Sequence, residues 1–90
     1  MKSKEYIIEQ YTESEYATHT GVKLLHHLLD NYDLTDFVKL EPRKLGKELG
    51  MGYSKVACNL SGLVFVEILV RDSLYGRYNR YMLNPKFVEE

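Results

Sequence analysis

Apolar side chains recur at three- and four-residue steps in three stretches of the chain, and a repeat of this spacing forms one face of a helix. The first stretch follows TESE at residues 12–15, which has the form of a capping box, and it ends near residue 33. The second begins at Pro42, whose missing N–H costs nothing in a first helical turn, and stops at Gly50. The third covers residues 53–64. The pattern therefore predicts three helices.

Extended structure is predicted between and after these helices. Residues 36–40, with the sequence DFVKL, favour a brief strand. Residues 67–72 and 77–83 flank the turn sequence SLYG and are typical of a β-hairpin. Two-residue alternation puts Tyr81 and Leu83 on the same face of the second hairpin strand.

The order of the elements indicates the fold class. We interpret EYIIEQY near the amino terminus as a short extended arm or strand, so residues 1–12 are assigned to an N-terminal arm and residues 13–88 to the folded domain. Three helices closed by a C-terminal β-hairpin predict an α+β fold of the winged helix-turn-helix type, in which the hairpin is the wing.

Composition is that of one small soluble domain. The 90 residues are 44% apolar and 28% charged, with a formal net charge of -1. The longest apolar run, residues 63–70, contains Glu67 and is far shorter than the ~20 residues that span a bilayer. The amino terminus lacks the apolar block of a signal peptide, and Cys58, the single cysteine, cannot form an internal disulfide. We expect a cytoplasmic protein with no membrane association.

The charges are unevenly distributed along the chain. Residues 1–40 hold four lysines against seven carboxylates, and residues 42–88 hold eight basic residues against three carboxylates. The electrostatic field depends on where charges lie, so the carboxy-terminal half can attract a polyanion although the whole chain is nearly neutral.

Residues 44–69 carry a helix-turn-helix pattern. The segment KLGKELGMGYSKVACNLSGLVFVEIL is similar to the motif of bacterial winged-helix DNA-binding proteins, and the matching positions are Leu45, Leu49, Gly50, Val56, Leu60, Leu63 and Ile68. Over residues 20–88 the chain resembles the small replication initiators of Gram-positive plasmids and related phage proteins. The resemblance implies a protein of plasmid or phage type that binds double-stranded DNA with sequence preference. Its role would be DNA replication initiation, marking of an origin or conjugation transfer site, or transcription regulation.

Two positions depart from that family. Its third helix usually opens with Ser or Thr, where this chain has Gly52, and glycine usually precedes the first wing strand, where this chain has Glu67. The exposed side of the third helix is also poor in groups that read base edges, because it offers Lys55 among small residues.

The hairpin tip supplies what the third helix lacks. Arg77 and Arg80 offer forked donors suited to phosphates and to narrow A·T-rich minor grooves. Tyr75, Tyr78 and Asn79 can donate to phosphates and sugars or read minor-groove acceptors. We expect the wing to be a principal DNA contact; a simply solvated tip is the alternative.

The other candidate DNA contacts lie on the second and third helices and the first wing strand. The start of the third helix points into the groove in this fold, which favours Tyr53 and Lys55, whereas Ser54 either donates to phosphate or caps the helix. The cations of the second helix either anchor phosphates or form a solvated face. The full set is Arg43, Lys44, Lys47, Tyr53, Ser54, Lys55, Arg71, Tyr75, Arg77, Tyr78, Asn79 and Arg80.

Catalytic and metal chemistry find no support in the sequence. His26 and His27 diverge by about 100° on a helix, and His19 lies two turns away, so these histidines form no compact ligand set. Nicking initiators use a tyrosine nucleophile with a His-apolar-His metal motif, which HTGVKLLHH does not contain. We expect no enzyme activity, metal, cofactor or small-molecule ligand.

A protein-interaction module without DNA binding is the alternative function. Small residues on the exposed side of the third helix would let another helix approach closely, and Phe65 stands where a polar residue is more usual. A homodimer through the N-terminal arm and first helix is also expected, because four apolar or aromatic side chains exceed the needs of so small a core. These are Tyr6, Ile8, Tyr11 and Tyr16.

Overall fold

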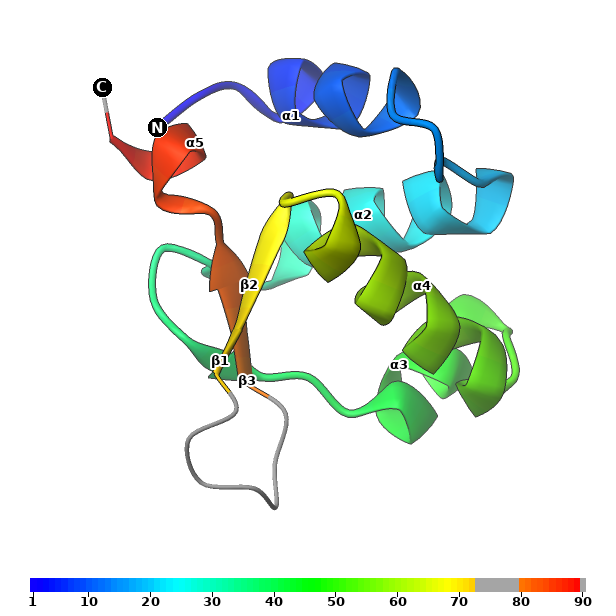
Figure 1. Ribbon diagram of the computed structural model, residues 1–90. Helices are drawn as coiled ribbons and strands as arrows, with labels where there is room; N and C mark the ends of the chain where they lie inside the picture. Colours follow the sequence, from blue (N-terminus) through cyan, green and yellow to red (C-terminus); the bar gives the residue numbers. More distant parts are fainter. Residues whose placement is uncertain (73–79, 90) are drawn as a thin grey trace.

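The computed structural model describes residues 1–72 and 80–89, and these residues form an α+β fold (Figure 1). Within them lie five helices and one three-stranded antiparallel sheet with the strand order β1-β3-β2. The elements are α1 Lys4–Thr12, α2 His19–Asn31, β1 Val38–Lys39, α3 Pro42–Leu49, α4 Tyr53–Phe65, β2 Leu69–Asp72, β3 Arg80–Leu83 and α5 Pro85–Val88.

One core joins the helices to the sheet. The buried positions of α4 are Val56, Leu60 and Leu63, which confirms the predicted apolar stripe, and α2 contributes three buried leucines. Each fully buried aliphatic side chain of this kind stabilises a fold by about 1.5–3 kcal/mol. The core residues are Ile7, Tyr11, Leu24, Leu25, Leu28, Leu34, Leu40, Leu45, Val56, Leu60, Leu63, Ile68, Leu69, Tyr81, Leu83 and Phe87.

The prediction of an extended N-terminal arm was wrong, because residues 4–12 form helix α1. Ser3 caps this helix by accepting a hydrogen bond from the backbone N–H of Tyr6. Ile7 and Tyr11, four residues apart, are both buried against the rest of the core. The four-residue spacing of these two side chains is the helical signal, whereas the apparent alternation at Tyr6 and Ile8 was misleading.

The predicted capping box at residues 12–15 was also wrong. Thr12 ends α1 and its hydroxyl donates to the carbonyl of Ile8, whereas α2 begins six residues later than expected from that box. The N-cap of α2 is Thr18, whose hydroxyl accepts from the N–H of Gly21. Tyr16 therefore lies in the connection between the two helices and not on the apolar face of α2.

The alternation predicted the buried face of β3 correctly, whereas β2 begins at Leu69 and not at residue 67, and β1 is limited to Val38–Lys39. Tyr81 and Leu83 of β3 are buried, and Tyr81 pairs with both Val38 of β1 and Arg71 of β2. The turn sequence of the predicted hairpin falls on residues 73–79, outside the described part of the chain. The short helix α5, not predicted from the sequence, buries Phe87.

Helix α4 ends in a Schellman motif with an unusual residue at its left-handed position. The N–H of Ile68 donates to the carbonyl of Leu63, and the N–H of Glu67 donates to that of Val64. Glu67 takes a φ of 65°, a region that glycine adopts without steric cost. The departure noted in the sequence, glutamate where the resembling family has glycine, therefore carries strain.

Glu67→Gly is expected to stabilise the protein by about 0.5–1 kcal/mol, because relief of the left-handed strain exceeds the added entropy of the unfolded chain. Equilibrium urea unfolding measures the effect. Gly50, which ends α3 with a φ of 68°, is the matched control. Gly50→Ala should destabilise by a similar amount, and a loss of stability in Glu67→Gly would contradict the assignment of strain.

Candidate nucleic-acid interface

The turn between α3 and α4 brings the cationic helix α3 against the start of α4. Gly50 ends α3 in the left-handed conformation, as the sequence predicted, and the N–H of Met51 returns to the carbonyl of Gly46. Gly46 is buried at this point, and a Cβ there would lie 2.4 Å from the Met51 carbonyl oxygen. The absence of a side chain at Gly46 therefore lets the turn close tightly.

The predicted cations of α3 are all exposed. Arg43 stacks its guanidinium carbon 4.8 Å from the ring centroid of Tyr53, the first residue of α4. Lys47 lies with them along an open hollow of ≈ 510 Å³ between the two helices. Lys44 is exposed on the same helix. The structure therefore brings together the predicted contacts Arg43, Lys47 and Tyr53.

The start of α4 presents Tyr53, Ser54 and Lys55 to solvent. The N-cap is Gly52, which makes no side-chain bond, and Ser54 lies inside the first turn. Of the two readings of Ser54, the helix-capping one is therefore wrong. The first N–H groups of a helix carry partial positive charge, which adds to that of Lys55.

A partly buried polar network around the buried Asn59, missed in the sequence, holds α4 in register against α2. The amide Oδ1 of Asn59 accepts from the Thr18 hydroxyl at 2.7 Å. Its Nδ2 donates to Thr20 Oγ1 at 3.1 Å and to the carbonyl of Lys55 at 2.9 Å. Asn59 lies between buried positions of the apolar stripe, and a polar residue at such a position is the signal that could have found it.

Arg71 turns from strand β2 onto the exposed side of α4. Its Nη2 donates to Ser61 Oγ at 3.0 Å, and its guanidinium carbon lies 5.3 Å from the ring centroid of Tyr81. Its buried Nε finds no acceptor among the described residues. Arg71 therefore adds a cation to a helix face on which sequence reasoning counted only Lys55.

The hairpin contacts are described only in part. Arg80 is exposed, its Nη1 lies 4.0 Å from Asp72 Oδ2, and its Nη2 donates to the carbonyl of Phe37 at 3.4 Å. The other predicted contacts of the hairpin tip lie outside the described residues. They are Tyr75, Arg77, Tyr78 and Asn79.

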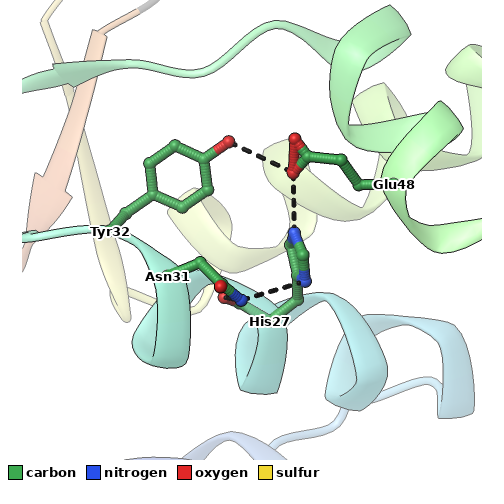
Figure 2. Close-up of polar contacts among 4 residues, drawn as sticks. All are labelled: His27, Asn31, Tyr32 and Glu48. Atoms are coloured by element: carbon green, nitrogen blue, oxygen red, sulfur yellow. Dashed lines mark hydrogen bonds and ion pairs between the residues drawn. The ribbon is translucent and has the colours of Figure 1, made fainter.

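Figure 2 shows the polar cluster that joins α2 to the cationic helix α3. His27 Nε2 lies 2.8 Å from Glu48 Oε1, and His27 Nδ1 lies 3.2 Å from the Asn31 amide nitrogen. Tyr32 donates its hydroxyl to the same Glu48 oxygen at 3.4 Å. The described residues contain no group of three or more histidine, cysteine or acidic side chains arranged to hold a metal ion.

The same cluster shifts two pKa values in opposite directions. The hydrogen bond from His27 lowers the pKa of the Glu48 carboxyl. Burial, together with the nearby Glu48 charge, raises the pKa of the Tyr32 hydroxyl. Glu48 is therefore held as a carboxylate that joins the two helices.

Glu48→Gln is expected to destabilise the protein near neutral pH and to have little effect in acid. A carboxyl whose pKa is lowered by folding contributes stability above its unfolded pKa, and this contribution is lost as pH falls through the folded value. Urea unfolding of both proteins at about pH 7 and about pH 3 measures it. A stability difference that is equal at both pH values would contradict a role for the Glu48 carboxylate in its hydrogen bond with His27.

The carboxylates of α1 and the cations of α3 lie at different ends of the molecule. Helix α1, with Glu5, Glu9 and Glu13, lies at the top of Figure 1, and α3 lies near the bottom with the open ends of β2 and β3. Among the acids near α3, Glu41 pairs with Lys39 at 2.9 Å and Glu48 faces His27. The acidic helix α1 and the cationic helix α3 are therefore well separated in space.

Within the described residues, the helices are too short or too polar to cross a membrane. Comparison of the chain with protein-family models, with curated proteins and with solved structures finds no match, so any function must be argued from the geometry of the interface.

Proposed function

We propose that this chain is a winged helix-turn-helix protein that binds double-stranded DNA with sequence preference. The order α2-β1-α3-α4-β2-β3 supports the fold, and so does the pairing of β1 with β3, which joins the hairpin to the segment between α2 and α3. In this reading α3 and α4 are the helix-turn-helix and β2 with β3 is the wing.

The observation that carries the proposal is the set of exposed cations on α3 and at the start of α4, at the end of the molecule opposite α1 (Figure 1). Arg43, Lys44, Lys47 and Lys55 can meet phosphates there, and the two carboxylates beside them, Glu41 and Glu48, contact Lys39 and His27. Cations gathered on one side of a nearly neutral protein attract a polyanion and orient the protein on it.

Each part of this surface has a separate task. The start of α4 enters the major groove, and the small side chains of its outer face let the helix backbone lie close to the base edges. Arg43 and Lys47 bind phosphates beside the groove, with the Arg43 guanidinium held in place by Tyr53. The wing, with Arg80 on β3, reaches a flanking phosphate or minor groove, and Arg77 stays a predicted contact outside the described residues.

The process served is replication initiation, marking of an origin or transfer site, or transcription control, in the cytoplasm of a cell carrying a plasmid or phage. All three require the same binding surface. The acidic end would point away from the duplex and stay accessible to other molecules.

Selection of bound duplexes from a random pool tests the proposal, because it reports binding, sequence preference and half-site spacing together. An enriched motif of fixed sequence is the expected result. A pool that stays random, with no retention above that of an acidic control protein at physiological salt, would reject DNA binding.

A protein-interaction module without DNA binding is the second candidate, and one pair of exposed aromatic rings favours it. Phe65 is 68% exposed and Tyr16 55% exposed, and their ring centroids lie 4.8 Å apart in an edge-to-face arrangement. Exposed aromatic side chains are enriched where proteins meet. Retention of duplex DNA at physiological salt separates this candidate from the first.

The homodimer expected from the sequence stays a prediction, and fewer of the four side chains on which it rested are available to a partner. Tyr11 is 1% exposed inside the protein's own core and is not available to a partner. Tyr6 is 42% exposed beside Phe87, and Ile8 is half-buried. Sedimentation equilibrium reports whether a dimer forms.

A further inference from the structure

Helix α1 carries a stripe of carboxylates whose side chains make no hydrogen bond or ion pair with another described residue. Glu5, Glu9 and Glu13 follow one another at four-residue steps, so they lie on one face of the helix and repel each other. Glu13 is the C-cap, where the helix dipole also disfavours negative charge. All three are exposed, and none bonds its side chain to another described residue.

The stripe borders a hollow of ≈ 470 Å³ between α1 and α2. Its floor is formed by Ile8 and Thr12 of α1 and by His26 of α2, so the surface between the carboxylates is partly apolar. Lys4 also lines it, but its ammonium group is held by Asp30 at 2.6 Å. The hollow therefore combines an acidic rim with a floor that an aliphatic stem can cover.

The complementary surface exists on the same molecule. Helix α3 displays Arg43, Lys44 and Lys47 at the other end of the fold (Figure 1). The stripe from Glu5 to Glu13 is about 12 Å long, and eight-residue α3 has about the same length. Because the net charge is only -1, two copies are not held apart by overall repulsion.

We propose that the hollow between α1 and α2 takes up helix α3 of a second copy, so that copies associate head to tail through opposite charge. Lysine and arginine stems lie over Ile8 and Thr12 while their charged groups meet the three carboxylates. The two contacting surfaces are different, so the association is heterologous, and each complex leaves one acidic and one basic end free for further growth.

This association does not rest on DNA binding, but it engages the cations proposed to bind phosphate. Duplex and second copy would therefore compete, and the protein would self-associate when free and separate when bound to DNA. The association is electrostatic and should weaken as the Debye length falls from about 14 Å at 0.05 M salt to about 4 Å at 0.5 M.

Sedimentation velocity of the full chain, without DNA, tests the proposal. At about 0.05 M NaCl the weight-average sedimentation coefficient should rise with protein concentration, and at about 0.5 M it should not. The variant Glu5→Gln/Glu9→Gln/Glu13→Gln and the variant Arg43→Gln/Lys44→Gln/Lys47→Gln should each stay monomeric. Glu15→Gln, an exposed glutamate outside the hollow, is the matched control and should associate as the unaltered protein does.

Mixing the two triple variants gives the sharpest result. One keeps the intact basic end and the other the intact acidic end, so together they should form a complex of one copy of each and grow no further. A sedimentation coefficient of the unaltered protein that does not change with concentration would overturn the proposal. Failure of the mixed variants to associate would also overturn it. So would association of either triple variant by itself, which is the behaviour expected of an isologous dimer.

Discussion

Replacing Arg43, Lys44 and Lys47 together with glutamine is expected to weaken duplex binding about 100-fold at about 0.1 M salt. For each phosphate contact that is lost, the DNA releases about one fewer counterion when the protein binds. The magnitude of the slope of log affinity against log salt should therefore fall by about three. All three side chains are exposed, and glutamine preserves helical preference, so the fold should not change. Fluorescence anisotropy with a selected duplex at several salt concentrations measures both quantities.

The matched control removes cations from the far side of the molecule. Lys2 and Lys86 are exposed near the termini, which lie together away from α3 in Figure 1. Lys2→Gln/Lys86→Gln should leave the salt slope unchanged. Equal losses of affinity in the control and in the α3 variant would mean that only overall charge matters. An unchanged slope in the α3 variant would mean that the α3 cations form a solvated face and do not contact phosphates.

Helix α4 could be predicted because its apolar residues Val56, Leu60 and Leu63 repeat at helical spacing. Pro42 and Gly50 mark the limits of α3, and both have local causes that sequence reveals. Helix α1 could not be predicted as well, since only two of its side chains, Ile7 and Tyr11, are buried. Two core contacts leave a weak periodic signal, and contacts with distant segments decide the conformation.

Some of the site residues could be predicted from the sequence and others could not, for the same reason. Arg43, Lys47 and Tyr53 could be proposed from residue type and position in the motif, and the structure brings them together. The bond from Arg71 to Ser61 and the network around Asn59 join elements far apart in sequence, so their partners could not be deduced from local pattern. Such pairs become visible only when the helices are packed.

Gly46→Ala is expected to destabilise the protein by about 2 kcal/mol, which lowers Tm by about 10 °C in a chain of this size. The added Cβ would lie 2.4 Å from the carbonyl oxygen of Met51, a backbone atom fixed by the left-handed turn at Gly50. Relief requires α3 and α4 to separate, and alanine's helical advantage of about 1 kcal/mol offsets only part of that cost. Thermal unfolding followed by circular dichroism measures the loss.

Gly62→Ala separates this steric effect from the intrinsic preference of alanine for helices. Gly62 is also inside a helix, but a Cβ there would meet nothing within 4 Å. The same substitution should therefore stabilise the protein by up to about 1 kcal/mol. Opposite signs at the two glycines would show that the tight approach at Gly46 sets how α3 and α4 lie together. Stabilisation at both positions would mean that the turn relaxes without cost, and the geometry of the cationic surface would then depend less on that turn.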